Sequence, residues 1–80
     1  MSLSIEMVFE CRTAREAAAL ESALEPDNHP LPKDHKLSSR RRGSVLTMEV
    51  TSPRPASCVS SAFSILSDAK LFAELWSLAS

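Results

Sequence analysis

The stretch from Pro55 to Ala79 constrains this sequence most, because after Pro55 it contains neither proline nor glycine and has the pattern of one long helix. Proline is tolerated in or just before the first helical turn, where Pro53 and Pro55 would lie. Only three charged residues interrupt the stretch, so it is too apolar for an ordinary surface helix. We therefore predict a helix over 55–79 that needs more than one packing surface.

The two halves of this helix differ in the width of their apolar arc when each residue is placed 100° further round the axis. In the first half the arc is roughly 160° wide, which indicates one buried face. In the second half it is roughly 220° wide, which one packing surface cannot cover. The first arc holds Val59, Ala62, Phe63, Ile65, Leu66 and Ala69, and the second holds Leu71, Phe72, Ala73, Leu75, Trp76, Leu78 and Ala79.

An apolar arc of this width is rarely left in water, so the helix predicts a protein interface. Phe72 and Trp76 are the expected anchors, because large aromatic side chains commonly dominate such contacts. The alternative is that Trp76 covers the bottom of the chain's own core, but the width of the arc favours an interface. The predicted interface consists of Phe63, Leu66, Phe72, Leu75, Trp76 and Ala79.

The length of 80 residues predicts one domain, 1–80, whose core is marginal on its own. Small domains are commonly stabilised by disulfides, a metal or oligomerisation. Cys11 and Cys58 make no disulfide framework and are expected to be two buried thiols. His29 and His35 lack the compact Cys/His cluster of a structural zinc site. Oligomerisation therefore remains as the expected source of added stability, in agreement with the apolar helix.

The sequence shows no targeting or membrane signal. Its N-terminus lacks the basic and apolar regions of a signal peptide. Serines and charged residues interrupt the terminal helix before it reaches about 18 consecutive apolar residues. We expect a soluble, cytoplasmic protein that does not contact a membrane.

Three strands and two helices follow from the local patterns. Alternation of apolar and polar residues predicts the strands. Thr13 and Glu16 form a capping box, in which the hydroxyl accepts from the amide of residue 16 and the Glu side chain returns the bond. Gly43 lies where a hairpin needs a positive φ. The predicted boundaries are 3–10, 36–42 and 45–51 for the strands, and 13–25 and 55–79 for the helices.

The order of these elements predicts the fold class. A right-handed crossover through the first helix makes the first two strands parallel and not adjacent. The third strand pairs antiparallel with the second and fills the gap between them. We predict an α+β two-layer sandwich of β-α-β-β-α order, with a three-stranded antiparallel sheet of order 1-3-2 and both helices on one face.

The sequence argues against an enzyme. A single glycine excludes a Gly-rich phosphate loop. Asp27, His29, Asp34 and His35 share one Pro-rich loop, and solvation of that loop is a simpler account than an acid/base cluster. We expect no catalytic residue, no cofactor and no metal.

A basic hairpin is the main electrostatic feature. Residues 1–27 carry a net charge of −4 and residues 33–54 a net charge of +4. The simplest interpretation is a solvated edge strand that resists aggregation. The alternative is a contact with an RNA backbone, without base stacking because no aromatic residue is interleaved. Its candidate residues are Lys33, Lys36, Arg40, Arg41 and Arg42, of which strand alternation sends Arg41 to the opposite face from Arg40 and Arg42.

The helix ending at 23–28, with the sequence ALEPDN, lies between a Phe-containing strand and a hairpin that leads to one long terminal helix. This arrangement resembles the Pcc family, the small dimerisation subunit of the KEOPS (EKC) complex, from about Leu3 to Leu78. Its most specific element is the motif Leu-x-Pro-Asp-Asn at 24–28. One departure is that Phe63 and Ser67 align where family members often carry Arg and Asn, so the contacts of those two residues are not carried over.

The resemblance implies a non-catalytic subunit that forms a dimer with itself or with a paralogue. In the family this dimer packs against helices of the catalytic subunit, which transfers a threonylcarbamoyl group to an adenosine beside the tRNA anticodon. The resemblance also suggests tRNA as the ligand of the basic hairpin. The first hypothesis is therefore an assembly subunit in tRNA modification, and the alternative is a small RNA-binding protein that uses the hairpin.

Overall fold

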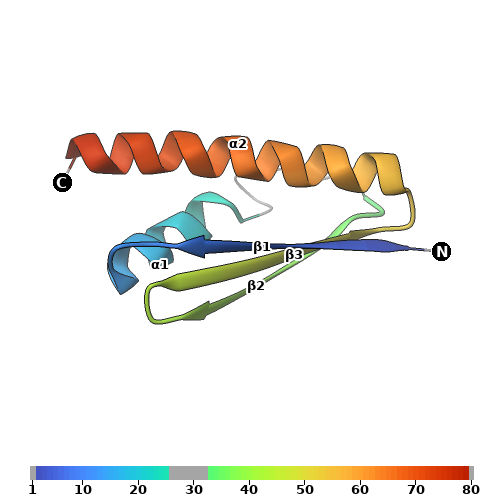
Figure 1. The fold of residues 1–80 in the computed structure, drawn as a ribbon. Helices are drawn as coiled ribbons and strands as arrows, with labels where there is room; N and C mark the ends of the chain where they lie inside the picture. Colours follow the sequence, from blue (N-terminus) through green and yellow to red (C-terminus); the bar gives the residue numbers. More distant parts are fainter. Residues whose placement is uncertain (1, 26–32, 80) are drawn as a thin grey trace.

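The computed structural model describes residues 2–25 and 33–79, which form a sheet covered on one side by two helices (Figure 1). The longer helix runs along the length of the sheet, and its C-terminal end projects past the turn between the second and third strands. In chain order the elements are β1 (Leu3–Glu10), α1 (Ala14–Ala23), β2 (Lys36–Arg42), β3 (Val45–Ser52) and α2 (Pro55–Ala79).

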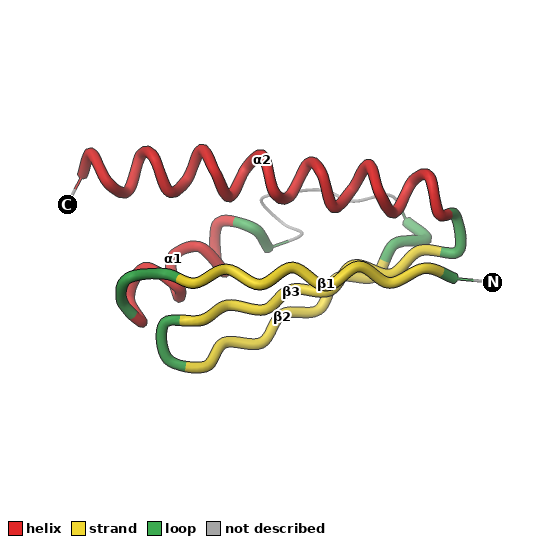
Figure 2. The backbone as a smooth tube through the Cα atoms, in the orientation of Figure 1, coloured by secondary structure: helices red, strands yellow, loops and turns green. Residues whose placement is uncertain are grey.

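The three strands form one antiparallel sheet with β3 in the centre, in the order β1-β3-β2 (Figure 2). β3 pairs with β1 along its whole length and with β2 from Val45 to Thr51. Because both outer strands are antiparallel to β3, they are parallel to each other, as a crossover through α1 requires. Gly43 has a φ of 59° in the turn between β2 and β3. The predicted α+β class and strand order are confirmed.

The N-terminus of α1 is closed by side chains. Thr13 is extended, with φ −138° and ψ 161°, and its hydroxyl accepts from the backbone N–H of Glu16 at 3.1 Å. The Glu16 carboxylate in turn accepts from the backbone N–H of Arg12 at 3.0 Å. The return bond thus goes one residue further back than the capping-box pattern predicted. Because Thr13 is the extended cap, the helix begins at Ala14.

The C-terminus of α1 also differs from the prediction of a helix to residue 25. Leu24 leaves the helical region, with φ −97° and ψ 5°, although its N–H still donates to the Leu20 carbonyl at 3.0 Å. The N–H of Glu25 donates to the carbonyl of Ser22 at 3.4 Å, which tightens the last turn. The regular helix therefore ends at Ala23.

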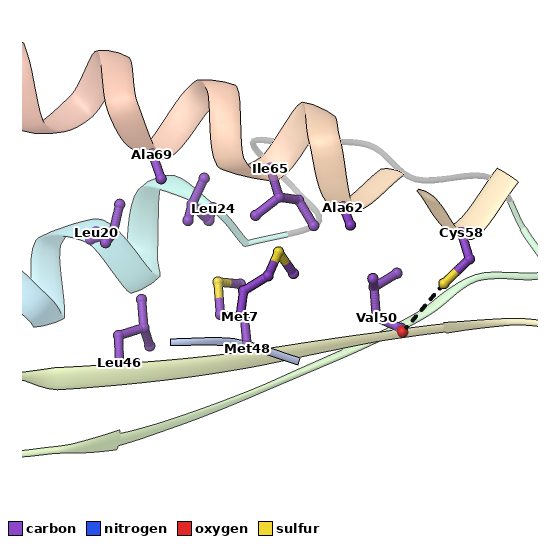
Figure 3. Packing of buried hydrophobic residues seen from close by; sticks show 10 residues of the cluster. All are labelled: Met7, Leu20, Leu24, Leu46, Met48, Val50, Cys58, Ala62, Ile65 and Ala69. Carbon is purple, nitrogen blue, oxygen red and sulfur yellow. Dashed lines mark hydrogen bonds between the residues drawn. The ribbon is translucent and has the colours of Figure 1, made fainter. Parts of the chain in front are cut away.

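The core lies between the two helices and the sheet (Figure 3). The sheet contributes large side chains to it, α1 contributes Leu20, and Leu24 follows directly after that helix. From α2, Ile65 is the only large aliphatic side chain in the core, because the other core positions of that helix are Cys or Ala. Burial of one large apolar side chain stabilises the fold by about 1.5–3 kcal/mol. The core residues are Met7, Leu20, Leu24, Leu46, Met48, Val50, Cys58, Ala62, Ile65 and Ala69.

The thiol of Cys58 holds the first turn of α2 to the sheet. Its Sγ donates to the carbonyl of Leu3 at 3.4 Å. It also donates to the carbonyl of Val50 at 3.6 Å, as Figure 3 shows. Both cysteines are free. Cys58 is buried as expected, whereas Cys11 is only half-buried.

Candidate protein interface

Helix α2 buries small side chains and exposes large ones. Its buried side chains are Cys58, Ser61, Ala62, Ile65 and Ala69, at the spacing of one narrow helical stripe. Phe63, by contrast, is 71% exposed. The other large apolar side chains that α2 exposes are Val59, Leu66, Leu71, Leu75 and Leu78.

The prediction that the first half of α2 buries its whole apolar arc is wrong. Val59, Phe63 and Leu66 all fall in that arc, and all three are exposed. The reason is geometric, because the sheet has only three strands and α1 covers part of the same face. A single helix resting on a narrow sheet buries a stripe along its underside and leaves its flank in water. The surplus apolar surface therefore extends along both halves of α2.

A groove of about 360 Å³ lies where this exposed flank meets β1. Leu66, Lys70 and Ala73 line it from α2, and Val8 and Phe9 line it from the strand. β1 is an outer strand of the sheet, so the edge that faces away from β3 has no partner strand among the described residues. An apolar helix flank beside an open strand edge presents the two features by which another β-containing chain can add to a sheet.

The thiol of Cys11 lies in the same groove. Burial raises the pKa of this thiol, and the nearby Glu16 carboxylate raises it further. Both effects favour the neutral thiol over the thiolate. Cys11 is therefore part of the groove wall rather than a reactive nucleophile.

The C-terminal half of α2 carries the second exposed area. Phe72 packs against the core, and the ring of Trp76 stacks on it with centroids 5.7 Å apart and an interplanar angle of 23°. Leu75 and Ala79 are exposed nearby. Of the six predicted interface residues, Phe72 and Trp76 are thus half-buried, and the other four are exposed. Their role in an interface stays a prediction.

The helix overhangs the sheet because it is longer. Its 25 residues span about 37 Å at 1.5 Å per residue, whereas the eight residues of β1 span about 26 Å. The last turns of α2 therefore continue past the end of the sheet, as Figure 1 shows. Leu78, which is 85% exposed, lies on this overhang.

The five basic residues predicted to contact RNA do not all lie on the same face of the sheet. Arg41 lies on the helix side of β2, where its Nε donates to the Glu21 carboxylate of α1 at 3.3 Å. Glu21 also accepts from the hydroxyl of Ser39 at 2.8 Å. Lys36, Arg40 and Arg42 have the opposite parity on β2 and are exposed, as is Lys33 before the strand. Alternation predicted the division of the arginines, whereas the partner of Arg41 depends on where α1 lies.

A second polar cluster joins the start of β2 to the start of α2. Arg54 donates to both carboxylate oxygens of Asp34, at 2.9 and 3.1 Å, and these bonds lower the pKa of Asp34. His35 is buried, contrary to the expectation of a solvated loop, and within the described residues neither of its ring nitrogens has a hydrogen-bond partner. Its Nδ1 lies 3.7 Å from the Asp34 carboxylate. Asp27 and His29, which were grouped with this pair, lie outside the described residues.

The described residues contain no group of three or more His, Cys, Asp or Glu side chains that could hold a metal ion. Within residues 2–25 and 33–79, neither helix has the length and apolar character needed to cross a bilayer.

The same fold occurs in a solved complex of two proteins. A chain in the crystal structure of the binary Gon7–Pcc1 complex aligns with a TM-score of 0.83, covering 98% of this chain and 96% of that chain. The two chains share one fold. Their sequence identity is 20%, and at that level the likeness to the Gon7–Pcc1 chain concerns the fold. No family model matches the sequence, and no curated protein matches it either.

Proposed function

We propose that this chain is a dimerisation and assembly subunit of a KEOPS-type complex, related to the Pcc family. The observation that carries the proposal is the arrangement of α2, whose small side chains are buried and whose large apolar side chains are in water. Exposed apolar areas of this extent typically mark protein–protein contacts. Two further points support the proposal, namely the fold shared with a chain of the Gon7–Pcc1 complex and the resemblance of the sequence to the Pcc family.

The flank beside β1 is the proposed dimer surface. Val59, Phe63 and Leu66 follow one another at spacings of four and three residues, which places them on one side of α2. Leu66 borders the groove next to β1, so this side faces the open strand edge. A second copy, or a paralogue with the same layout, can pack its own helix on the flank and its own strand along the edge.

The C-terminal half of α2 is the proposed surface for the catalytic subunit. Leu71, Leu75 and Leu78 are exposed there, and the Phe72–Trp76 stack connects this area to the core. Helices of a larger partner can pack on an overhanging helix from several sides, because none of the described strands lies beneath its last turns. The stacked aromatic pair supplies a preorganised anchor for such a contact.

In this role the chain does no chemistry. It supports threonylcarbamoyl-adenosine modification of tRNA by holding the catalytic subunit in the assembled complex. The described residues provide a helix surface and a strand edge, and burial and the Glu16 carboxylate raise the pKa of the Cys11 thiol in the groove. The protein would act in the cytoplasm, where it regulates the enzyme by binding.

The test measures the solution mass of the purified chain by sedimentation over a range of concentrations, together with capture of a purified KEOPS catalytic subunit. We expect a dimer at twice 8.7 kDa. Phe63→Asp places a charge on the proposed dimer surface and should yield monomers. Leu75→Asp and Trp76→Ala should leave the dimer intact and weaken capture of the catalytic subunit. Ser38→Asp, at an exposed position of β2 and outside both areas of α2, is the matched control.

Two results would overturn the proposal. One is a folded wild-type monomer at every concentration that also fails to capture the catalytic subunit. The other is equal behaviour of Phe63→Asp, Leu75→Asp and the Ser38→Asp control in both assays. Circular dichroism of each variant separates a lost contact from a lost fold.

A further inference from the structure

No element of the described residues covers the face of the sheet that points away from the helices. It carries alternate side chains from all three strands, and none of them is aromatic. Figure 1 shows both helices on the other side of the sheet. The side chains of this open face are Ser4, Glu6, Val8 and Glu10 from β1, Val45, Thr47, Glu49 and Thr51 from β3, and Lys36, Ser38, Arg40 and Arg42 from β2.

Charge on the open face is separated by strand. The acids of β1 lie on one edge, and the bases of β2 lie on the other, about 10 Å away across two strand spacings. In the central strand, Glu49 lies directly opposite Glu6. Arg42, at the hairpin end of β2, lies four residues along the strand from the position opposite Glu49, and Glu10 lies beyond Val45 on the far strand.

Arg40 and Arg42 form no ion pair with another described residue, although other arginines of the chain do. Arg41 is paired with Glu21, and Arg54 is paired with Asp34. Arg40 lies opposite Thr47, and Arg42 lies opposite Val45, so no carboxylate stands across the ladder from either guanidinium. Both guanidinium groups are thus available to an external anion.

A recess of about 640 Å³ adjoins these side chains and is lined by Arg40, Arg41, Arg42, Val45 and Thr47. The Thr47 hydroxyl adds a neutral hydrogen-bonding group. Arg40 and Arg42 are two residues apart, or about 6.8 Å along the strand. That distance matches the axial rise of about two nucleotides in one stacked strand.

We propose that this recess binds the phosphate backbone of a nucleic acid strand that runs along β2. Guanidinium groups bind phosphate through two parallel hydrogen bonds, and each contact releases counterions. Lys36, on the same face of β2, extends the basic track beyond Arg40. The inference goes beyond the assembly role and does not depend on it.

The same surface predicts how selective the site is. Because the open face carries no aromatic side chain, it offers no platform for base stacking, so binding should be independent of base sequence. Glu6 and Glu49 border a neighbouring recess of about 390 Å³ together with Arg40. Their carboxylates repel phosphate, so the nucleic acid should stay along β2 and away from β1.

The test titrates the full chain against fluorescently labelled single-stranded RNA and against DNA of the same sequence, between about 50 and 200 mM salt. We expect the double variant Arg40→Glu/Arg42→Glu to lower affinity by about ten-fold or more at low salt. The neutral variant Arg40→Gln/Arg42→Gln should lower the slope of log affinity against log salt by about 1.4, since a single-strand phosphate contact contributes about 0.7. Glu49→Gln should raise the affinity.

The matched control is Arg12→Glu/Arg15→Glu, which changes the net charge equally at two exposed positions at the start of α1. This control should lose less affinity, relative to the wild type, than Arg40→Glu/Arg42→Glu loses. Equal losses in the two double variants would overturn the proposal, because net charge alone would then explain the binding. Binding to anionic lipid vesicles without binding to either nucleic acid would overturn it as well. Equal affinity for RNA and DNA supports a site that binds the phosphate backbone alone. Preference for RNA over DNA also supports the site and adds a contact with the 2′-hydroxyl group.

Discussion

The two helices cover the same sheet but use their side chains in opposite ways. Helix α1 buries its large residue Leu20 together with Ala17, and its outward positions are small or polar. Helix α2 buries mainly small residues and presents Phe63 and several leucines to water. α1 thus has the pattern of a helix that packs only on the core of the chain, whereas α2 has the pattern of a helix with apolar surface left for a second contact. A helix packed on a sheet can therefore stabilise the fold and expose apolar surface at once.

The largest expected effect comes from replacing one leucine in each helix. Leu20→Ala removes a side chain that is 4% exposed and should lower the free energy of unfolding by about 2–5 kcal/mol. Leu71→Ala removes a side chain that is 55% exposed and should change it by about 0.5 kcal/mol or less. Urea unfolding at low protein concentration measures both. Equal losses would contradict the difference between the two helices.

A smaller effect is expected at the cap of α1. Thr13→Ala removes the hydroxyl that accepts from the Glu16 amide and should cost about 1 kcal/mol of stability. The stability of a short helix depends more on its cap than that of a long helix does, because the first turn is a larger fraction of the hydrogen bonds in α1. Ser67→Ala, in the middle of α2, is the control and should change stability little. The same urea unfolding assay applies, and a Thr13→Ala variant as stable as the control would argue against the cap.

The smallest effect concerns the link between Asp34 and Arg54 at the start of α2. The hydrogen bonds from Arg54 lower the pKa of Asp34 in the folded chain, so the ionised carboxylate favours folding. This contribution is present above the ordinary pKa of aspartate, near 4, and is lost as the pH falls through the lowered value. Asp34→Asn should therefore reduce the acid sensitivity of folding.

This pH dependence is measured by urea unfolding at a series of pH values from about 5 down to about 2. Glu74→Gln, at an exposed position of α2, serves as the control for the loss of a carboxylate. Curves for Asp34→Asn and the wild type that remain parallel throughout this range would show that the ion pair does not contribute.

Local patterns were sufficient to predict most of the fold. Apolar alternation in β1 and β3, the cap at Thr13 and the single glycine at the hairpin each act over a few residues. Such signals depend on backbone geometry and hydrogen bonds that form with near neighbours, so they can be interpreted without the rest of the structure. The surplus apolar surface of the C-terminal half of α2 was also predictable from the width of its arc.

The part that could not be predicted depends on contacts between distant residues. A helical projection places Phe63 and Ala62 in the same arc, but only the width of the sheet decides that Ala62 is buried and Phe63 is not. Likewise, alternation separates Arg41 from Arg40 and Arg42, yet only the position of α1 gives Arg41 its partner Glu21. The burial of His35 has no local signal at all.

The sequence by itself determined which segments become strands and helices, their order in the sheet, and that α2 carries more apolar surface than one core needs. The tertiary structure alone decided which apolar residues of α2 are in water and which arginines pair with a described carboxylate. The physical reason is that secondary structure follows from interactions along the chain, whereas exposure follows from how much surface the neighbouring elements cover. The sheet formed by the described residues has three strands, so that cover is small, and the exposed flank of α2 is the result.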